Sequence, residues 1–132
     1  MIPVKEMIAL CKARADDATA LFEAKRYDGA VYTCGYVVEI ALKIRICKTL
    51  KWQNFPPSKS QDFKAFKVHN LDFLLTCSGK EVEIKKNYFN LWSFFTSNWN
   101  SEMRYENRKI DEHGAAEMLK ASQTLQINIC KL

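Results

Sequence analysis

The sequence predicts an all-α protein that folds as an antiparallel up-and-down bundle of four long helices plus one short helix. Apolar residues recur three and four positions apart over most of the chain, which is the spacing of a helix with one buried face. No convincing pair of strands and no internal repeat interrupts this pattern. The length of 132 residues and the hydrophobic content of 48% suit a single domain, residues 1–132, with a real core.

The first helix is expected over roughly residues 3–25. Pro3 suits a first helical position, because the N–H that proline lacks would have no partner there. Apolar residues then follow at helical spacing: Ile8, Cys11, Ala15, Ala18 and Phe22. Ala15 and Ala18 are small, so a neighbouring helix can approach closely beside them.

The second helix is expected over roughly residues 28–50, with Asp28 as its N-cap. Its segment CGYVVEIALKIRI begins at Cys34 and is apolar on nearly every side. A helix of this kind lies at the centre of a core or is shared with a partner subunit. We therefore expect the central helix of the bundle here, and a homodimer interface is the alternative that the same pattern allows.

Residues 51–67 are expected to form a long loop, because two prolines oppose a helix there. A loop of this length is either functional or mobile. Its aromatic side chains would anchor it: Trp52, Phe55, Phe63 and Phe66.

The C-terminal half is expected to begin with a short helix that Asn70 caps and Gly79 ends. A further helix is expected over about residues 80–98, and a second loop over residues 98–110. The apolar face of that helix comprises Ile84, Tyr88, Leu91, Trp92 and Phe95. Asp111 should cap the last helix, whose buried positions would be Ala115, Met118, Ser122, Leu125 and Ile129.

The charge balance is basic, with a formal net charge of +5 and a pI of about 9.0. This permits nucleic acid or another acidic partner. The simpler alternative is a solvated lysine-rich surface.

Five cysteines stand in apolar contexts, and no two of them have the C-x-x-C spacing. An odd number of buried thiols fits a reducing compartment, so we expect a cytoplasmic protein without disulfides. Neither His69 nor His113 has a cysteine nearby, and we predict no metal site and no cofactor. The chain shows no signal peptide and no membrane span.

Glu39 and Lys43 stand one helical turn apart within the apolar second helix, and they share an edge with Tyr32 and Tyr36. With the glutamate first, this spacing favours an ion pair. Buried charges persist when they are paired, so a structural pair on that edge is one interpretation. The other is a polar binding site in which Glu39 orients a further group.

Three other candidate groups are His69, Arg104 and Tyr105. His69 follows the long loop, where it is either a cap or packing residue or an acid–base group. Arg104 and Tyr105 lie in the second loop, beyond a tryptophan-rich helix end. The arginine would either stack on an aromatic ring, with Trp92, Trp99 and Tyr105 as candidates, or contact a phosphate.

Arg108 and His113 form the remaining candidate pair, with four residues between them. An arginine and a histidine can cleave RNA without a metal, since histidine moves a proton while arginine offsets the charge of the phosphate. Pairs at this spacing also arise readily by chance. Asp111 lies between the two and would cap a helix, which separates them onto different local structures.

Several of these residues follow the order of a known family. The run from Ala13 to Leu50 resembles the first two helices of HEPN domains. The matching positions are Arg14, Asp17, Ala18, Leu21, Tyr27, Ala30, Glu39, Ala41, Leu42 and Lys43. The segment FKVHNLDFLL resembles the family's His–x–Leu–x–x–Leu segment, and MRY precedes the last helix as it does in the family.

The resemblance implies a bundle of four long helices plus a short one, in a protein that is usually a homodimer. It also implies a bacterial toxin–antitoxin, defence or stress system, often with a nucleotidyltransferase partner protein. Active members are metal-independent ribonucleases that use an arginine and a histidine four to six residues later. The family name records a proposed nucleotide-binding role.

The family arginine best matches Arg104. The histidine should then lie at positions 109–111, which hold Lys109, Ile110 and Asp111, whereas Arg108 and His113 lie one turn too late. We therefore expect a module that binds RNA, a nucleotide or a nucleotidyltransferase partner without strong catalysis. A ribonuclease toxin is the first alternative, and a structural adaptor that docks through its aromatic loop is the second.

Overall fold

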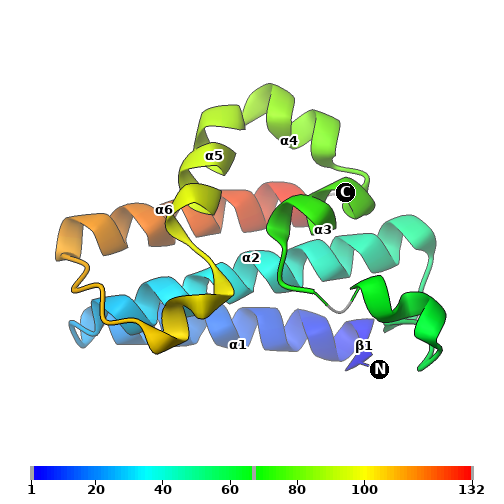
Figure 1. The fold of residues 1–132 in the computed structure, drawn as a ribbon, viewed down its shortest axis with the longest axis horizontal. Coiled ribbons are helices and arrows are strands. Elements are labelled where there is room, and N and C mark those ends of the chain that lie inside the picture. The colour runs from blue at the N-terminus through cyan, green and yellow to red at the C-terminus, as the bar shows by residue number, and fades with distance from the viewer. Residues whose placement is uncertain (1, 67, 132) are drawn as a thin grey trace.

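Three long helices lie side by side in the computed structural model, which describes residues 2–66 and 68–131 (Figure 1). They are α1 (Val4–Glu23), α2 (Tyr27–Leu50) and α6 (Glu112–Cys130). Helix α1 runs antiparallel to α2, and α6 runs in the same direction as α2. The predicted all-α class, with helices packed against one another, is confirmed.

Helix α2 is the centre of this arrangement, because it packs against α1, α6 and the short helix α3 (Leu71–Ser78) at once. Side chains on every side of α2 are buried, including those of Val31, Val38, Leu42 and Ile46. Each aliphatic side chain of this size contributes about 1.5–3 kcal/mol when it leaves water. The prediction of a central helix at this position is confirmed.

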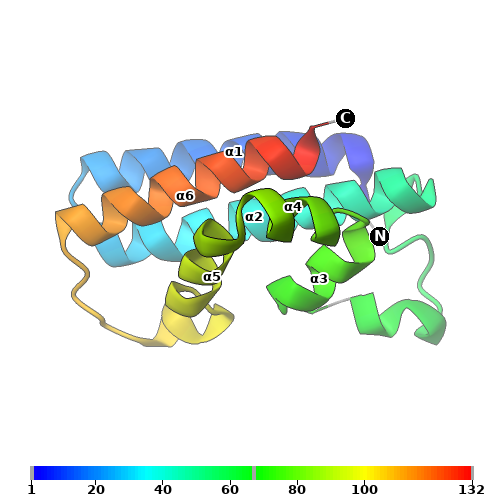
Figure 2. The same cartoon turned by 90° about the horizontal axis from the view of Figure 1, so that it is seen from above.

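A second layer crosses one side of the long helices (Figure 2). It consists of α3, α4 (Glu81–Asn87) and α5 (Phe89–Asn98). The predicted cap of α3 is confirmed, since the Asn70 side chain accepts a hydrogen bond from the Phe73 N–H at 3.0 Å. Gly79 ends the helix with a left-handed backbone at φ 79°, a conformation that glycine adopts without steric cost.

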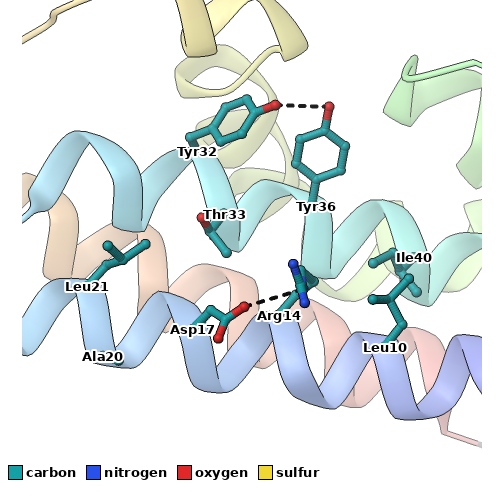
Figure 3. Close-up of a pocket in the computed structure, with 9 residues that line it drawn as sticks. All are labelled: Leu10, Arg14, Asp17, Ala20, Leu21, Tyr32, Thr33, Tyr36 and Ile40. Carbon is teal, nitrogen blue, oxygen red and sulfur yellow. Dashed lines mark hydrogen bonds and ion pairs between the residues drawn. The ribbon is translucent and has the colours of Figure 1, made fainter.

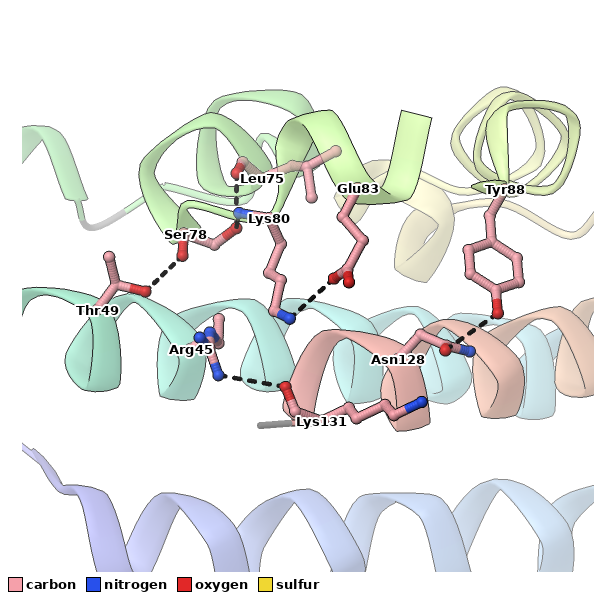
Figure 4. Close-up of polar contacts among 9 residues, drawn as sticks. All are labelled: Arg45, Thr49, Leu75, Ser78, Lys80, Glu83, Tyr88, Asn128 and Lys131. Carbon is pink, nitrogen blue, oxygen red and sulfur yellow. Dashed lines mark hydrogen bonds and ion pairs between the residues drawn. The ribbon is translucent and has the colours of Figure 1, made fainter. Parts of the chain in front are cut away.

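The single long helix expected over residues 80–98 is instead two helices that meet at Tyr88. The backbone of Tyr88 leaves the helical region there, at φ −136° and ψ 30°. Its hydroxyl donates to Asn128 Oδ1 of α6 at 3.1 Å (Figure 4). The change of direction lets Tyr88 reach α6 while Trp92 and Phe95 stay in the core.

Polar contacts fasten the ends of α2, α3 and α6 together (Figure 4). The Thr49 hydroxyl donates to the Ser78 carbonyl oxygen at 2.6 Å. Arg45 Nη1 donates to the Lys131 carbonyl oxygen at 3.3 Å. These bonds satisfy carbonyl groups that a helix leaves without partners at its C-terminal end.

The N-terminus holds a short pair of strands that the sequence did not predict. Strand β1 (Ile2–Pro3) pairs antiparallel with β2 (Asn54–Phe55), and Ile2 lies opposite Phe55. Pro3 is therefore in a strand and immediately precedes α1, which corrects its expected place as the first helical residue. The segment after β2 also forms a short 3-10 helix, η1 (Gln61–Phe66).

Asp28 has a different role from the predicted cap of α2. The helix begins at Tyr27, and Arg26 occupies the cap position. The Asp28 carboxylate reaches across to the second loop and accepts hydrogen bonds from three backbone N–H groups. The donors and their distances are Arg108 at 2.8 Å, Lys109 at 3.2 Å and Ile110 at 2.8 Å.

The predicted start of the last helix is confirmed. The Asp111 side chain accepts a hydrogen bond from the Gly114 N–H at 2.7 Å. Within residues 2–66 and 68–131, none of the helices has the length and apolarity needed to cross a membrane.

Candidate functional site

Glu39 is buried in the middle of α2, with 3% of its surface exposed. Each of its carboxylate oxygens has a basic partner. Oε2 accepts from Lys43 Nζ at 3.2 Å, and Oε1 lies 2.8 Å from His69 Nδ1. Burial of an isolated carboxylate would cost several kcal/mol, so these two partners explain why a charge persists in the core.

Lys43 faces inward and completes this arrangement. Only 15% of its side chain is exposed, and its ammonium lies 5.4 Å from the centre of the Phe55 ring. The position of the lysine is therefore that of a structural partner of Glu39, between the carboxylate and the aromatic loop.

His69 brings the segment before α3 onto α2. Its Nδ1 faces Glu39, and its ring meets the ring of Tyr36 edge to face with centroids 5.8 Å apart. The side chain is 50% exposed. A carboxylate on Nδ1 favours the tautomer that carries its proton there, so Nε2 is the nitrogen with a free lone pair in the neutral ring. Glu39 thus orients the imidazole for proton transfer or hydrogen bonding.

Two tyrosines continue the site along α2. The Tyr32 hydroxyl donates to the Tyr36 hydroxyl at 3.3 Å (Figure 3). Burial, and after it the hydrogen bond with Tyr32, raises the pKa of Tyr36. The Tyr36 phenol therefore stays neutral near pH 7, and both tyrosines offer hydrogen-bonding hydroxyls and apolar rings.

Trp99 anchors the second loop against these tyrosines. Its indole N–H donates to the Tyr32 carbonyl oxygen at 3.0 Å, and its ring meets Tyr36 edge to face at 5.5 Å. The ring lies directly over Gly35, where an added Cβ would be 1.9 Å from Trp99 Nε1. Only glycine at this position lets the tryptophan come so close to α2.

Arg104 and Tyr105 lie just beyond Trp99, in the 3-10 helix η2 (Ser101–Tyr105). The guanidinium carbon of Arg104 is 4.7 Å from the centre of the Tyr105 ring, so the expected stacking of this arginine occurs on Tyr105. The phenols of Tyr105 and Tyr32 raise the pKa of Arg104. Within residues 2–66 and 68–131, no carboxylate forms an ion pair with Arg104.

The structure therefore brings Glu39, His69 and Arg104 to the same side of α2, with the two tyrosines between them. We call Glu39, His69, Tyr32, Tyr36 and Arg104 the polar cluster. Glu39 and Lys43 balance each other in charge. The exposed groups that remain for a ligand are the guanidinium of Arg104 and the imidazole of His69.

Arg108 and His113 have separate partners. Arg108 Nε forms an ion pair with Glu106, and the backbone of Arg108 is held by Asp28. His113 is in the first turn of α6, with its side chain 82% exposed and its Nε2 3.0 Å from Glu117 Oε1. Each side chain is thus satisfied by a carboxylate near it in sequence, and neither belongs to the polar cluster.

The cysteine thiols are poor candidates for nucleophiles. Burial raises the pKa of Cys11 and of Cys34 to about 12, and that of Cys47 to about 11. Thiols with such pKa values are protonated at neutral pH, whereas the thiolate is the reactive form. No group of three or more potential metal ligands occurs in the part of the chain that the structure describes.

Sequence reasoning missed the contributions of Gly35, Trp99 and Asp28. The indole of Trp99 bonds to a residue 67 positions away, and the carboxylate of Asp28 bonds to residues at least 80 positions away. Nothing in the local sequence marks such contacts.

Comparison with family models, with curated proteins and with solved structures finds no match to this chain. The geometry of the polar cluster and the family-like order of its residues therefore carry the functional argument.

Proposed function

We propose that this protein is a HEPN-type module that binds the phosphate groups of RNA or of a nucleotide at the polar cluster. The observation that carries the proposal is that Arg104 and the Glu39-oriented His69 flank the hydrogen-bonded pair of Tyr32 and Tyr36. Among the residues that the structure describes, 2–66 and 68–131, no carboxylate forms an ion pair with this arginine. The resemblance supports two further parts of the proposal, homodimerisation and a nucleotidyltransferase-like partner in a bacterial toxin–antitoxin, defence or stress system.

The chemistry of each group suits an anionic ligand. A guanidinium donates two parallel hydrogen bonds to a phosphate, and it keeps its charge at every physiological pH. His69 adds one donor or acceptor through Nε2. Tyr105 is 74% exposed under the guanidinium, where its ring can stack on a base. The net charge of +5 attracts a polyanion toward the surface.

A titration of labelled single-stranded RNA and of ATP tests the proposal. Arg104→Ala should weaken binding about 10- to 150-fold, because a charge-assisted hydrogen bond contributes about 1.5–3 kcal/mol. It should also lower the salt dependence of RNA binding by about one phosphate contact. Arg108→Ala is the matched control, since its side chain pairs with Glu106 outside the cluster. The absence of salt-dependent binding of either ligand would remove the proposal.

A metal-independent ribonuclease is the second candidate, and the Glu39–His69 pair favours it. His69 Nε2 would take the proton of a ribose 2′-hydroxyl, whose oxygen would then bond to the adjacent phosphorus. The bond from phosphorus to the 5′-oxygen would break, and the imidazolium would return the proton to that oxygen. Arg104 would offset the added negative charge on the phosphate oxygens during the transfer.

Incubation of RNA with the protein in the presence of a chelator tests this second candidate. Cleavage should leave 2′,3′-cyclic phosphate ends, and His69→Ala should abolish it. His113→Ala should leave the rate unchanged, because its imidazole faces Glu117 away from the cluster. If His113→Ala and Arg108→Ala abolished cleavage and His69→Ala did not, the assignment of the chemistry to the polar cluster would be wrong.

A further inference from the structure

A groove of about 680 Å³ runs between α1 and α2 (Figure 3). Its walls are mainly apolar, with Leu10, Leu21 and Ile40 among the lining side chains. Sites for small organic ligands have volumes of about 300–1,000 Å³ and combine apolar walls with a few polar groups. The groove has the dimensions and the surface of such a site.

Helix α1 supplies two charged side chains to the groove, Arg14 and Asp17, and Thr33 of α2 also lines it. Arg14 Nε lies 3.4 Å from Asp17 Oδ2, and the two side chains are 44% and 53% exposed. An ion pair this exposed contributes little to stability, so either partner can turn toward a ligand at small cost. Together they present N–H donors and carboxylate acceptors beside apolar side chains. The donors and acceptors can bond to the hydrogen-bonding edge of a nucleobase, and the apolar side chains can pack against its face.

The groove is continuous with the polar cluster, because Tyr32 and Tyr36 belong to both. Their rings rise from α2 along the border of the groove opposite α1 (Figure 3). The same Tyr36 ring contacts His69, and Trp99 holds η2, with its Arg104, against both tyrosines. A ligand with an apolar planar part and an anionic part would therefore find complementary surfaces on the two sides of this tyrosine pair.

The charge balance of the combined surface favours an anionic occupant. Arg14 offsets Asp17, and Lys43 offsets Glu39. The guanidinium of Arg104 is left as its net charge. A second copy of the chain would bring its own excess of positive charge, since each chain carries +5, whereas a phosphate would neutralise Arg104.

We propose that the groove between α1 and α2 binds the base and ribose of a nucleoside monophosphate unit whose phosphate contacts Arg104 and His69. This inference rests on the proposed function, and it adds to the phosphate contacts a defined place for the nucleoside. Arg14 and Asp17 then select among bases, because their donors and acceptors meet the hydrogen-bonding edge of the base.

Calorimetric titration with adenosine 5′-monophosphate and with ribose 5-phosphate tests the inference, because the two ligands differ in the base alone. The wild type should bind the nucleotide at least about tenfold more tightly than the sugar phosphate. Ala20→Phe places a ring in the groove from an exposed position of α1. It should abolish this difference, because the added ring occupies the space of the base. Ala9→Phe, at an exposed position of the same helix outside the groove, should preserve the difference.

The alternative outcomes separate the groove from the phosphate site. Equal affinities of the wild type for the two ligands would overturn the groove assignment and leave the phosphate contacts of the proposed function in place. Failure of the wild type to bind either ligand would overturn both. A second copy of the chain is the other possible occupant of the groove, and light scattering on Ala20→Phe tests for it. If the wild type is a dimer and this variant is a monomer, a second copy occupies the groove and the proposal is overturned. A preference among the four nucleoside monophosphates that changes in Arg14→Gln would confirm that the groove contacts the base.

Discussion

Two regions of this protein offer an arginine and a histidine, and they differ in how these residues are held. In the polar cluster, His69 and Arg104 come from separate segments and lie beside the tyrosine pair of α2, with His69 on the buried Glu39. In the segment from Arg108 to His113, each side chain pairs with a glutamate two or four positions away. Short spacing in sequence thus gives Arg108 and His113 only local ion pairs, whereas the buried Glu39 draws Lys43 and His69 together from two segments.

The largest difference in stability is expected when the glutamate that pairs with the histidine is removed from each region in turn. Glu39→Ala leaves Lys43 with 15% of its side chain exposed and no counter-charge, so the free energy of unfolding should fall by about 3 kcal/mol. Glu117→Ala removes the partner of the exposed His113, and the change should stay within about 0.5 kcal/mol. Urea denaturation of both variants measures the difference. Equal losses would mean that Glu39 is no more important to the fold than a surface glutamate.

The second comparison substitutes one glycine beside each region, Gly35 at the polar cluster and Gly114 next to His113. Gly35→Ala should lower the free energy of unfolding by about 2 kcal/mol, because its Cβ would overlap the Trp99 ring. Gly114→Ala places its Cβ 3.1 Å from Asp111 Oδ1 in the first turn of α6, where the helical preference of alanine offsets the tight contact. Its effect should be less than about 1 kcal/mol.

Tryptophan emission, to which Trp99 contributes beside Trp52 and Trp92, reports whether Gly35→Ala acts on the indole. The added methyl group should displace the indole from Tyr32 and weaken ligand binding at Arg104. Unchanged tryptophan emission together with wild-type stability would show that the ring is not seated over Gly35.

The third prediction concerns the backbone of the segment from Arg108 to His113, which Asp28 holds in place. Asp28→Ala removes the acceptor of three backbone N–H groups, those of Arg108, Lys109 and Ile110. The expected loss is about 1–2 kcal/mol. Hydrogen exchange at these three amides should accelerate, while exchange at the amides of α2 around Glu39 stays slow. Asp28→Asn, which retains one acceptor oxygen, should have an intermediate effect, and acceleration across α2 would contradict the separation of the two regions.

Local signals in the sequence account for most of the helical layout. The caps at Asn70 and Asp111 and the stop at Gly79 depend on residues within four positions, so the sequence was sufficient to predict them. The break at Tyr88 depends on a bond to Asn128, which is 40 positions away. Asp28 was misassigned for the same reason, because a carboxylate near a helix start is suited to capping until a distant loop supplies better donors.

The contacts of the candidate site also fall into local ones, which the sequence predicts, and long-range ones, which it does not. The pairing of Glu39 with Lys43 follows from one helical turn and was predicted. The contact of Glu39 with His69 spans 30 positions, and its formation depends on how the loop after α2 returns to the bundle. The sequence placed Tyr32 and Tyr36 on one edge with Glu39, but it left open whether His69 and Arg104 reach that edge, and the contacts of His69 and Trp99 with Tyr36 are visible only in three dimensions.

The smallest expected effect concerns the tyrosine pair in alkaline solution. Burial raises the pKa of Tyr36 above its ordinary value of 10.0, so the folded state holds this proton more tightly than the unfolded chain. The resulting stabilisation is complete below pH 10 and is lost as the pH rises through the higher pKa of the folded state. Tyr36→Phe should cost only about 0.5 kcal/mol at pH 7, where it removes the 3.3 Å hydrogen bond with Tyr32.

Above pH 10, the stability of Tyr36→Phe should fall less steeply than that of the wild type, because the variant has no phenol to ionise at this position. The buried thiols contribute to the alkaline loss in both proteins, and their contribution cancels in the difference between the two curves. Denaturation at several pH values between 9 and 12 measures that difference. Parallel curves would show that the Tyr36 hydroxyl is open to water, and the wall between the groove and the polar cluster would then be looser than the contacts of Tyr36 with His69 and Trp99 indicate.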